Sequence, residues 1–207
     1  MKRTGSRPPA RLLAIADAGL LEDRLPEAVM QAARGGLRWF LLRARNLPPD
    51  RVAGLAGEIL AGAPDIFLSV HGTCFQAASG IHFPSHRIGE CVDAPEGMCA
   101  GASCHTRAEL ALAADSGADY AFLSPFYDPA SKPGRGAPLG AEGFKRVVTD
   151  IETPVFALGG VAPEKLREVR DAGAYGAAVL GGLFLAPDIT ARAKEYAEAA
   201  LEVFGGI

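Results

Sequence analysis

The segments DSGADYAFLS (residues 115–124) and DAGAYGAAVL (residues 171–180) follow the same pattern. In each segment a helical stretch ends at a glycine, and an apolar run typical of a buried strand begins within three residues. The same order of strand and helix returns along the rest of the chain. This repetition predicts a fold that is built from alternating strands and helices.

Eight short apolar runs predict strands, and most of them are followed by a helical pattern. The predicted strands are residues 11–16, 37–42, 66–70, 80–83, 98–103, 119–124, 155–158 and 176–180, and the predicted helices are residues 25–34, 49–60, 106–116, 141–148, 163–172 and 189–203. Unbroken apolar runs are typical of a parallel sheet that helices cover on its outer face. Eight units, without a glycine-rich dinucleotide loop after the first strand, favour a small (β/α)8 TIM barrel over a doubly wound sheet.

The composition narrows the class of protein. A chain of 207 residues with 49% hydrophobic and 22% charged residues predicts one domain over residues 1–207. The net charge of -3 gives no basic surplus for nucleic acid. No apolar run approaches the roughly 20 residues that cross a bilayer, and the basic start lacks the apolar core of a signal peptide, so we expect a cytoplasmic protein. The spacing of Cys74, Cys91, Cys99 and Cys104 predicts free thiols.

Histidines gather near the ends of the predicted strands. In a (β/α)8 barrel the segments after the strands share one face, and this face carries the active site. We therefore predict catalytic roles for His71, His82 and His105, since imidazole exchanges protons near neutral pH. The alternative is that each is an ordinary polar loop residue. A zinc site that adds Cys74 and Cys104 to His71 and His105 matches no established ligand spacing, so no metal site is predicted.

Paired glycines follow the last two predicted strands. They are Gly159 with Gly160, and Gly181 with Gly182. Main-chain N–H groups at such pairs, next to the start of a helix, can hold a phosphate without a charged side chain. The alternative is that the glycines only permit tight turns. Their place on neighbouring strands favours a phosphate-binding site.

Two further segments predict contacts with an anion. Arg43 and Arg45 end a buried strand, where two guanidinium groups need an anion or a carboxylate partner. The long segment SPFYDPASKPGRGAPLG (residues 124–140) predicts a lid that brings Ser131 and Lys132 to the phosphate. A solvated lysine on a mobile loop is the alternative for Lys132.

The chain resembles the thiamine phosphate synthase and TenI superfamily, small (β/α)8 barrels of thiamine biosynthesis. The matching segments are LLRAR (residues 41–45), SVHG (69–72), GIHFPS (80–85), GASCH (101–105), GADY (117–120), SPFY (124–127), ALGGV (157–161) and GAYGAAV (173–179). The resemblance implies that the phosphate of a thiazole phosphate binds at Gly160 and at Gly181–Gly182. It also implies that Arg43, Ser103 and Lys132 contact the substrate, with Arg45 in place of a family lysine.

The chain departs from the synthase pattern at two strand ends. The synthase places Asn-Asp after the third strand and Asp after the fourth, which hold the Mg²⁺ of a hydroxymethylpyrimidine diphosphate; here these places carry His71-Gly72 and Pro84-Ser85. These residues resemble the TenI branch, which is associated with tautomerising the thiazole phosphate without a metal. The histidine of that branch after the sixth strand corresponds to Pro125. Proton transfer would then fall to His71, His82 or His105.

Three hypotheses follow from the resemblance. The first is a TenI-like enzyme that binds thiazole phosphate, moves a proton and needs no cofactor. The second is a thiamine phosphate synthase with displaced Mg²⁺ ligands, for which Asp17 and Asp128 are the nearby carboxylates. The third is a non-catalytic sensor of thiazole phosphate or thiamine phosphate. The resemblance also leaves open a homo-oligomer, since members of the family are often oligomeric.

Overall fold

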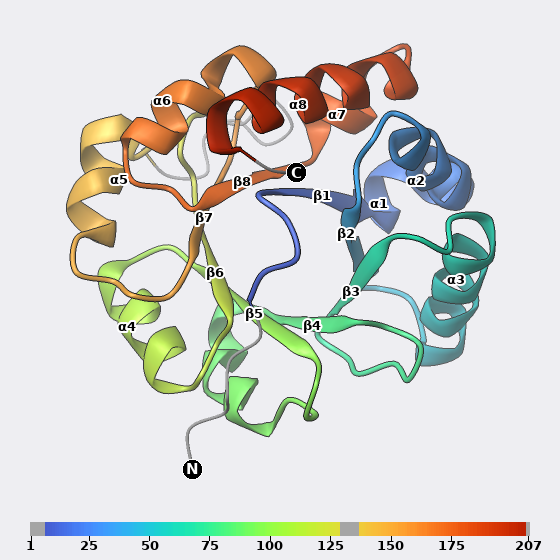
Figure 1. Cartoon of the computed structure of the whole chain (residues 1–207). Coiled ribbons are helices and arrows are strands. Elements are labelled where there is room, and N and C mark those ends of the chain that lie inside the picture. The colour runs from blue at the N-terminus through green and yellow to red at the C-terminus, as the bar shows by residue number, and fades with distance from the viewer. Residues whose placement is uncertain (1–6, 129–136, 206–207) are drawn as a thin grey trace.

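Eight parallel strands close into a barrel in the order of the chain (Figure 1). The computed structural model describes residues 7–128 and 137–205. The strands are β1 (Leu12–Asp17), β2 (Trp39–Arg43), β3 (Phe67–His71), β4 (Gly80–Phe83), β5 (Cys99–Cys104), β6 (Tyr120–Leu123), β7 (Val155–Leu158) and β8 (Gly176–Val179). The predicted (β/α)8 barrel is therefore confirmed, and each strand lies within two residues of its predicted bounds.

Helices surround the barrel, and most of them follow a strand (Figure 1). They are α1 (Ala18–Leu21), α2 (Leu25–Arg34), α3 (Pro49–Gly62), α4 (Arg107–Asp115), α5 (Gly140–Val148), α6 (Leu166–Asp171), α7 (Gly181–Phe184) and α8 (Ile189–Phe204), with 3-10 helices η1 (Glu22–Arg24), η2 (Ser85–Asp93) and η3 (Pro163–Lys165). Thr106 and Glu109 form a capping box that starts α4. Residues 72–79 form turns instead of a helix, because eight residues leave no room for a helix and its two connections.

Two layers of apolar side chains fill the molecule. The larger layer lies between the strands and the helices, and the smaller one lies inside the barrel. In the inner layer the ring of Trp39 packs edge to face on Tyr120, at 4.8 Å between centroids, and on Phe156, at 5.4 Å. Gly101 makes room for this packing, since a Cβ there would lie 2.1 Å from Cζ of Tyr120. Aromatic rings thus fill the inside of the barrel below its mouth, the end at which the strands finish.

The N-terminal segment covers the opposite end of the barrel. Residues 7–10 run across the end at which the strands begin (Figure 1), and Ala10 is buried there. The guanidinium of Arg11 stacks 3.6 Å above the ring of Tyr175 and donates a hydrogen bond to the Tyr175 carbonyl. Because this segment covers one end, the mouth is the open end for a ligand.

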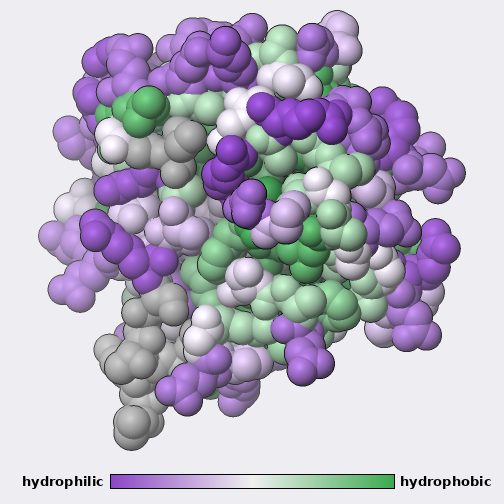
Figure 2. Space-filling view, turned by 45° about the vertical axis from the view of Figure 1, so that its right-hand side comes forward, coloured by the Kyte–Doolittle hydropathy of each residue, from purple (hydrophilic) through white to green (hydrophobic). Residues whose placement is uncertain are grey.

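The outer surface is mixed. Figure 2 shows hydrophilic residues around the edge of one face and paler or apolar residues in its middle. Large exposed apolar side chains are scattered over different elements: Leu47, Val92, Leu112, Leu185 and Leu201. Within the described part of the chain, no helix is long and apolar enough to span a membrane.

Candidate active site at the barrel mouth

Parallel pairing brings polar residues of different strands to the mouth. Asp17 at the end of β1 pairs in register with Arg43 at the end of β2, and His71 of β3 pairs with His82 of β4. Ser103 follows on β5, where its hydroxyl reaches the His82 ring. The strand alternation therefore turns these five side chains toward the inside of the barrel.

His82 is the buried centre of this group. Its Nε2 lies 2.9 Å from Oγ of Ser103, and its Nδ1 lies 3.0 Å from Oη of Tyr120. The ring stacks on Phe122 at 4.3 Å between centroids. Burial, with a smaller effect from the charge of His71, holds the pKa of His82 well below its ordinary value of 6.5. His82 is thus a neutral imidazole whose two nitrogens both have partners.

His71 lies closer to solvent, and its ring stacks 6.1 Å from that of His82. Burial lowers the pKa of His71 to about 4, and the positive charge of Arg45 acts in the same direction. Arg87 adds a smaller effect; it pairs with Glu90 and donates a 2.6 Å hydrogen bond to the carbonyl of Gly72. At neutral pH the His71 imidazole is therefore unprotonated and able to accept a proton.

Arg43 finds its counterion inside the protein. Its guanidinium forms an ion pair with Asp17, and each of the two side chains is 15% exposed. Arg45 is exposed beyond the end of β2. The sequence predicts that both arginines need an anionic partner. Asp17 is that partner for Arg43, whereas Arg45 is the guanidinium that can contact a ligand. The Asp17 carboxylate is already engaged by a cation.

The paired glycines lie side by side at the ends of β7 and β8. Gly159 and Gly160 have φ angles of +112° and +63°, which favour glycine. A Cβ at Gly160 would lie 2.8 Å from Cβ of Tyr127. At Gly182 a Cβ would lie 2.6 Å from Oη of Tyr196 and 3.5 Å from the carbonyl of Val161, next to Gly160. Packing thus explains why these positions carry glycine, in addition to the predicted role of the glycines in phosphate binding.

Main-chain amides at this place are available to a ligand. Gly181 and Gly182 are the first two residues of α7, and the first N–H groups of a helix have no partner within it. Gly160 lies exposed beside them. The predicted juxtaposition of the two glycine pairs is therefore found in the structure.

His105 takes a different position from the other two predicted histidines. Its Nδ1 lies 3.0 Å from the carbonyl oxygen of Ser124 and 3.2 Å from the Ser124 hydroxyl. The main-chain N–H of His105 donates to Glu109, within the cap of α4. The exposed His105 ring thus connects the loops after β5 and β6, while His71 and His82 stay together.

The structure also bears on the zinc alternative and on the lid. Cys104 is buried in the layer between strands and helices, whereas His71 faces the mouth, so the two do not share a site. Among residues 7–128 and 137–205, no three His, Cys, Asp or Glu side chains are grouped closely enough to hold a metal ion. Ser131 and Lys132 of the predicted lid lie outside the described residues.

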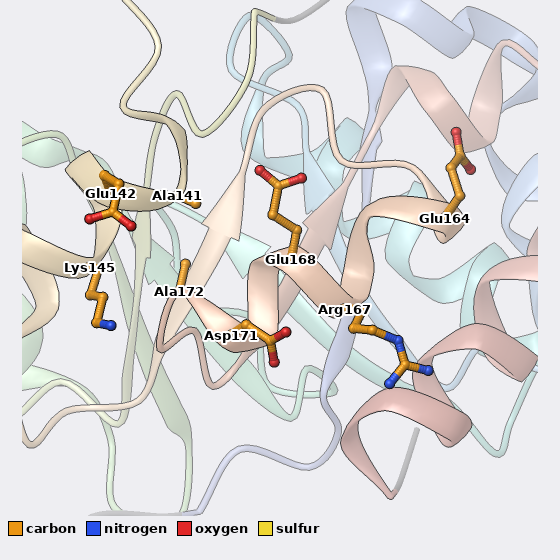
Figure 3. A pocket seen from close by; sticks show the side chains of 8 residues that line it. All are labelled: Ala141, Glu142, Lys145, Glu164, Arg167, Glu168, Asp171 and Ala172. Carbon is orange, nitrogen blue, oxygen red and sulfur yellow. The ribbon is translucent and has the colours of Figure 1, made fainter.

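A hollow of about 460 Å³ lies away from the mouth, between α5 and α6. Acidic and basic side chains line it: Glu142, Lys145, Glu164, Arg167, Glu168 and Asp171. These side chains point in different directions and do not converge on one point (Figure 3). The hollow therefore lacks the convergent polar groups that mark a specific binding site, and the mouth is the better candidate.

Fold and site together define an α/β barrel whose mouth carries polar side chains on one side and glycine-rich turns on the other. A family model described as thiamine monophosphate synthase matches residues 76–183. The chain belongs to this family, the thiamine phosphate synthase and TenI superfamily, and the resemblance seen in the sequence is confirmed.

Individual relatives agree with this membership. The chain is 32% identical over 194 residues to the thiamine-phosphate synthase of Herpetosiphon aurantiacus, covering 90% of this chain and 94% of the relative. It is 29% identical over 206 residues to that of Chloroflexus aurantiacus, with 89% and 90% covered. A solved thiamine phosphate pyrophosphorylase from Pyrococcus furiosus superposes with a TM-score of 0.81 at 24% identity, over 95% of this chain and 98% of that one, which shows the fold.

Proposed function

We propose that the chain is a TenI-like enzyme of thiamine biosynthesis that binds a thiazole phosphate at the barrel mouth and moves a proton on it. The observation that carries this proposal is the grouping of an unprotonated His71 with the His82–Ser103 pair, opposite the two glycine pairs. The side chains supply groups for proton transfer, and the glycine amides supply an anion site.

The phosphate would lie on the amides of Gly160, Gly181 and Gly182. These N–H groups and the start of α7 favour negative charge without a charged side chain. Arg45 is free to add positive charge at the mouth, and Lys132 remains a predicted further contact. A ligand held there by its phosphate extends its ring toward the opposite side of the mouth.

A tautomerisation needs one proton acceptor and one proton donor. His71 accepts a proton from one carbon of the ring system, and the protonated His71 returns a proton to another carbon, while the hydroxyl of Ser103 forms a hydrogen bond with the ligand. His82 supports Ser103 through the 2.9 Å hydrogen bond. The net reaction neither oxidises nor reduces the ligand, so it uses no redox cofactor. His105, near Ser124, remains a predicted catalytic residue, but it is neither the proton acceptor nor the proton donor in this scheme.

The residues at the mouth do not fit the Mg²⁺-dependent reaction of a synthase well. Mg²⁺ prefers carboxylates and water, whereas β3 ends in His71 and β4 is followed by Pro84 and Ser85. Of the two alternative carboxylates, Asp17 pairs with Arg43 and Asp128 is exposed on the loop after β6. We derive no step through a metal ion.

Coupling of thiazole phosphate to hydroxymethylpyrimidine diphosphate is the second candidate. It is favoured by the names of the relatives, which are thiamine-phosphate synthases. The two candidates differ in what they need, since coupling requires a second substrate and proton transfer requires only the thiazole phosphate.

Proton transfer can be measured with the purified chain in D₂O. We expect deuterium to enter a carbon position of the thiazole phosphate, followed by NMR, with no second substrate. His71→Gln should reduce this rate about 100-fold or more, as is typical for loss of a general base. His86→Gln is the matched control, because His86 is an exposed neighbour of His71 that the proposal does not use.

A coupling assay with Mg²⁺ runs beside this measurement. Formation of thiamine phosphate without deuterium exchange would overturn the proposal in favour of the synthase. Binding of thiazole phosphate with neither reaction would indicate the sensor instead. An exchange rate equal in His71→Gln and wild type would remove His71 from the mechanism.

A further inference from the structure

The last helix, α8, contacts both glycine turns of the barrel mouth. It packs against η3, α6 and α7, which follow β7 and β8 (Figure 1). From this helix, Oη of Tyr196 donates a 2.8 Å hydrogen bond to the carbonyl of Val161, directly after Gly160. Nε of Arg192 donates a 3.2 Å hydrogen bond to the carbonyl of Gly182. One helix thus holds the turn after β7 and the turn after β8.

The hydroxyl of Tyr196 lies between these two turns. A Cβ at Gly182 would stand 2.6 Å from this oxygen and 3.5 Å from the Val161 carbonyl to which the oxygen donates. A carbonyl oxygen can only accept a hydrogen bond, so the direction of this bond is fixed. The same hydroxyl therefore bonds to the first turn and lies against the second.

Glycine turns need such support if their amides are to bind an anion. Gly159 and Gly160 have left-handed φ angles of +112° and +63°. Because glycine has no Cβ, a pair of glycines can adopt several backbone conformations, and each would direct the N–H groups differently. Selecting one conformation during binding costs conformational entropy. Contacts that fix the turns before the ligand arrives reduce this cost.

We infer that Tyr196 is a positioning residue for the phosphate: its hydroxyl fixes the turn after β7 against the turn after β8, so that amides of both turns can meet one anion. Tyr196 is fully buried, so it acts through the turns and not by contact with the ligand. Arg192 holds the second turn from the same helix, so loss of the hydroxyl should weaken the site without abolishing it. The inference deepens the proposed function and rests on it for the place of the phosphate.

Titration with inorganic phosphate, followed through the NMR signals of the backbone amides, tests the inference. In the wild type we expect shifts at Gly160, Gly181 and Gly182. Tyr196→Phe removes only the hydroxyl and should raise the Kd for phosphate about three- to tenfold, the effect of one buried hydrogen bond. Tyr175→Phe is the matched control, because the ring of Tyr175 packs under Arg11 at the opposite end of the barrel. It should leave the Kd unchanged.

The outcomes of this titration separate the inference from the proposed reaction. An equal Kd in the wild type and in Tyr196→Phe would overturn the inference and leave the phosphate site in place. If phosphate shifted none of the three glycine signals in the wild type, the site itself would be wrong and the inference would fail with it. Absence of deuterium exchange on thiazole phosphate would remove the proposed reaction alone.

A ligand without a phosphate separates positioning from general damage to the mouth. In the exchange assay, Tyr196→Phe should raise the KM for thiazole phosphate and leave kcat as it is. Its affinity for the dephosphorylated thiazole should equal that of the wild type. An equal loss of affinity for both ligands would mean that the hydroxyl supports the whole mouth, and the inference would be overturned.

A second pair of variants tests the contact between the turns without any ligand. Gly182→Ala places a Cβ 2.6 Å from Oη of Tyr196, so it should lower the urea midpoint of unfolding. In the Tyr196→Phe background the same substitution should lower the midpoint less, because the clashing oxygen is absent. Equal decreases in the two backgrounds would show that the hydroxyl does not lie against the second turn, which would also overturn the inference.

Discussion

The two sides of the barrel mouth are made from different parts of the polypeptide. On one side, at the ends of β1 to β5, side chains from Asp17 to Ser103 meet through hydrogen bonds and an ion pair. On the other side, at the ends of β7 and β8, glycines expose the main chain. We call these the side-chain half and the main-chain half. The first can change its chemistry by substitution, whereas the second depends on the shape of the backbone.

This difference explains how members of one family can share a fold and differ in chemistry. In the main-chain half, the packing around Gly160 and Gly182 leaves no space for a side chain. In the side-chain half, the Asn-Asp of the synthase pattern corresponds to His71-Gly72, and the barrel is intact with these residues. Under the proposed function, a proton acceptor then stands beside an unchanged phosphate site, and the reaction differs although the fold is the same.

Substitutions in the main-chain half should have the largest effect on both folding and binding. Gly160→Ala places a side chain at a φ of +63° and 2.8 Å from Cβ of Tyr127, so we expect the free energy of unfolding to fall by about 2 kcal/mol or more. The affinity for thiazole phosphate should fall at least about tenfold, or about 1.4 kcal/mol. Urea unfolding and calorimetric titration measure the two effects.

Gly57→Ala is the control for this substitution. Gly57 is exposed within α3, and a Cβ there would meet no atom within 4 Å. Because alanine favours a helix more than glycine, this variant should be as stable as the wild type or more stable by up to about 1 kcal/mol. Unchanged phosphate affinity in a folded Gly160→Ala would contradict a ligand site in the main-chain half.

The sequence predicts the fold better than the site, and the two halves show why. Strands and glycine turns leave local signals, so the barrel and the paired glycines could be predicted. Contacts such as Asp17 with Arg43, or Tyr120 with His82, depend on which residues stand opposite each other in the closed barrel. Tyr120 belongs to the motif GADY (residues 117–120), but the motif does not show that Tyr120 contacts His82. That contact follows only from the register of the strands. His105 differs from the other histidines because the cap of α4 fixes its backbone.

Low pH should lower the free energy of unfolding through the histidines of the side-chain half. This loss should be smaller than that caused by Gly160→Ala. The folded chain holds His71, with a pKa of about 4, and His82 unprotonated, while the unfolded chain binds protons on both below about pH 6.5. The unfolded state then binds more protons, so stability falls as the pH drops from about 6.5 toward 4. His71 alone should contribute about 1 to 2 kcal/mol of this loss at pH 5, after allowance for its partial exposure.

Urea unfolding at pH 7.5 and at pH 5 checks this expectation. His71→Gln should reduce the difference in stability between the two pH values, whereas His105→Gln, on an exposed imidazole outside the pair, should leave it as it is. Equal reductions in the two variants would mean that the acid response comes from elsewhere in the molecule.

The smallest expected effect comes from the ion pair in the side-chain half. It is a gain in affinity for the ligand, not a loss. Asp17 and Arg43 neutralise each other at the mouth, so an anionic ligand that approaches Arg43 must compete with the Asp17 carboxylate. Asp17→Asn removes the competing charge and keeps a hydrogen-bonding group of similar shape. We therefore expect thiazole phosphate to bind a few-fold more tightly, equivalent to less than about 1 kcal/mol. Asp50→Asn, at an exposed position in the first turn of α3, removes the same charge from a carboxylate that is not the partner of Arg43, and it should not change the affinity. Weaker binding in Asp17→Asn would instead mean that the carboxylate holds Arg43 in the orientation that the ligand needs, and the two halves would then act on the ligand together.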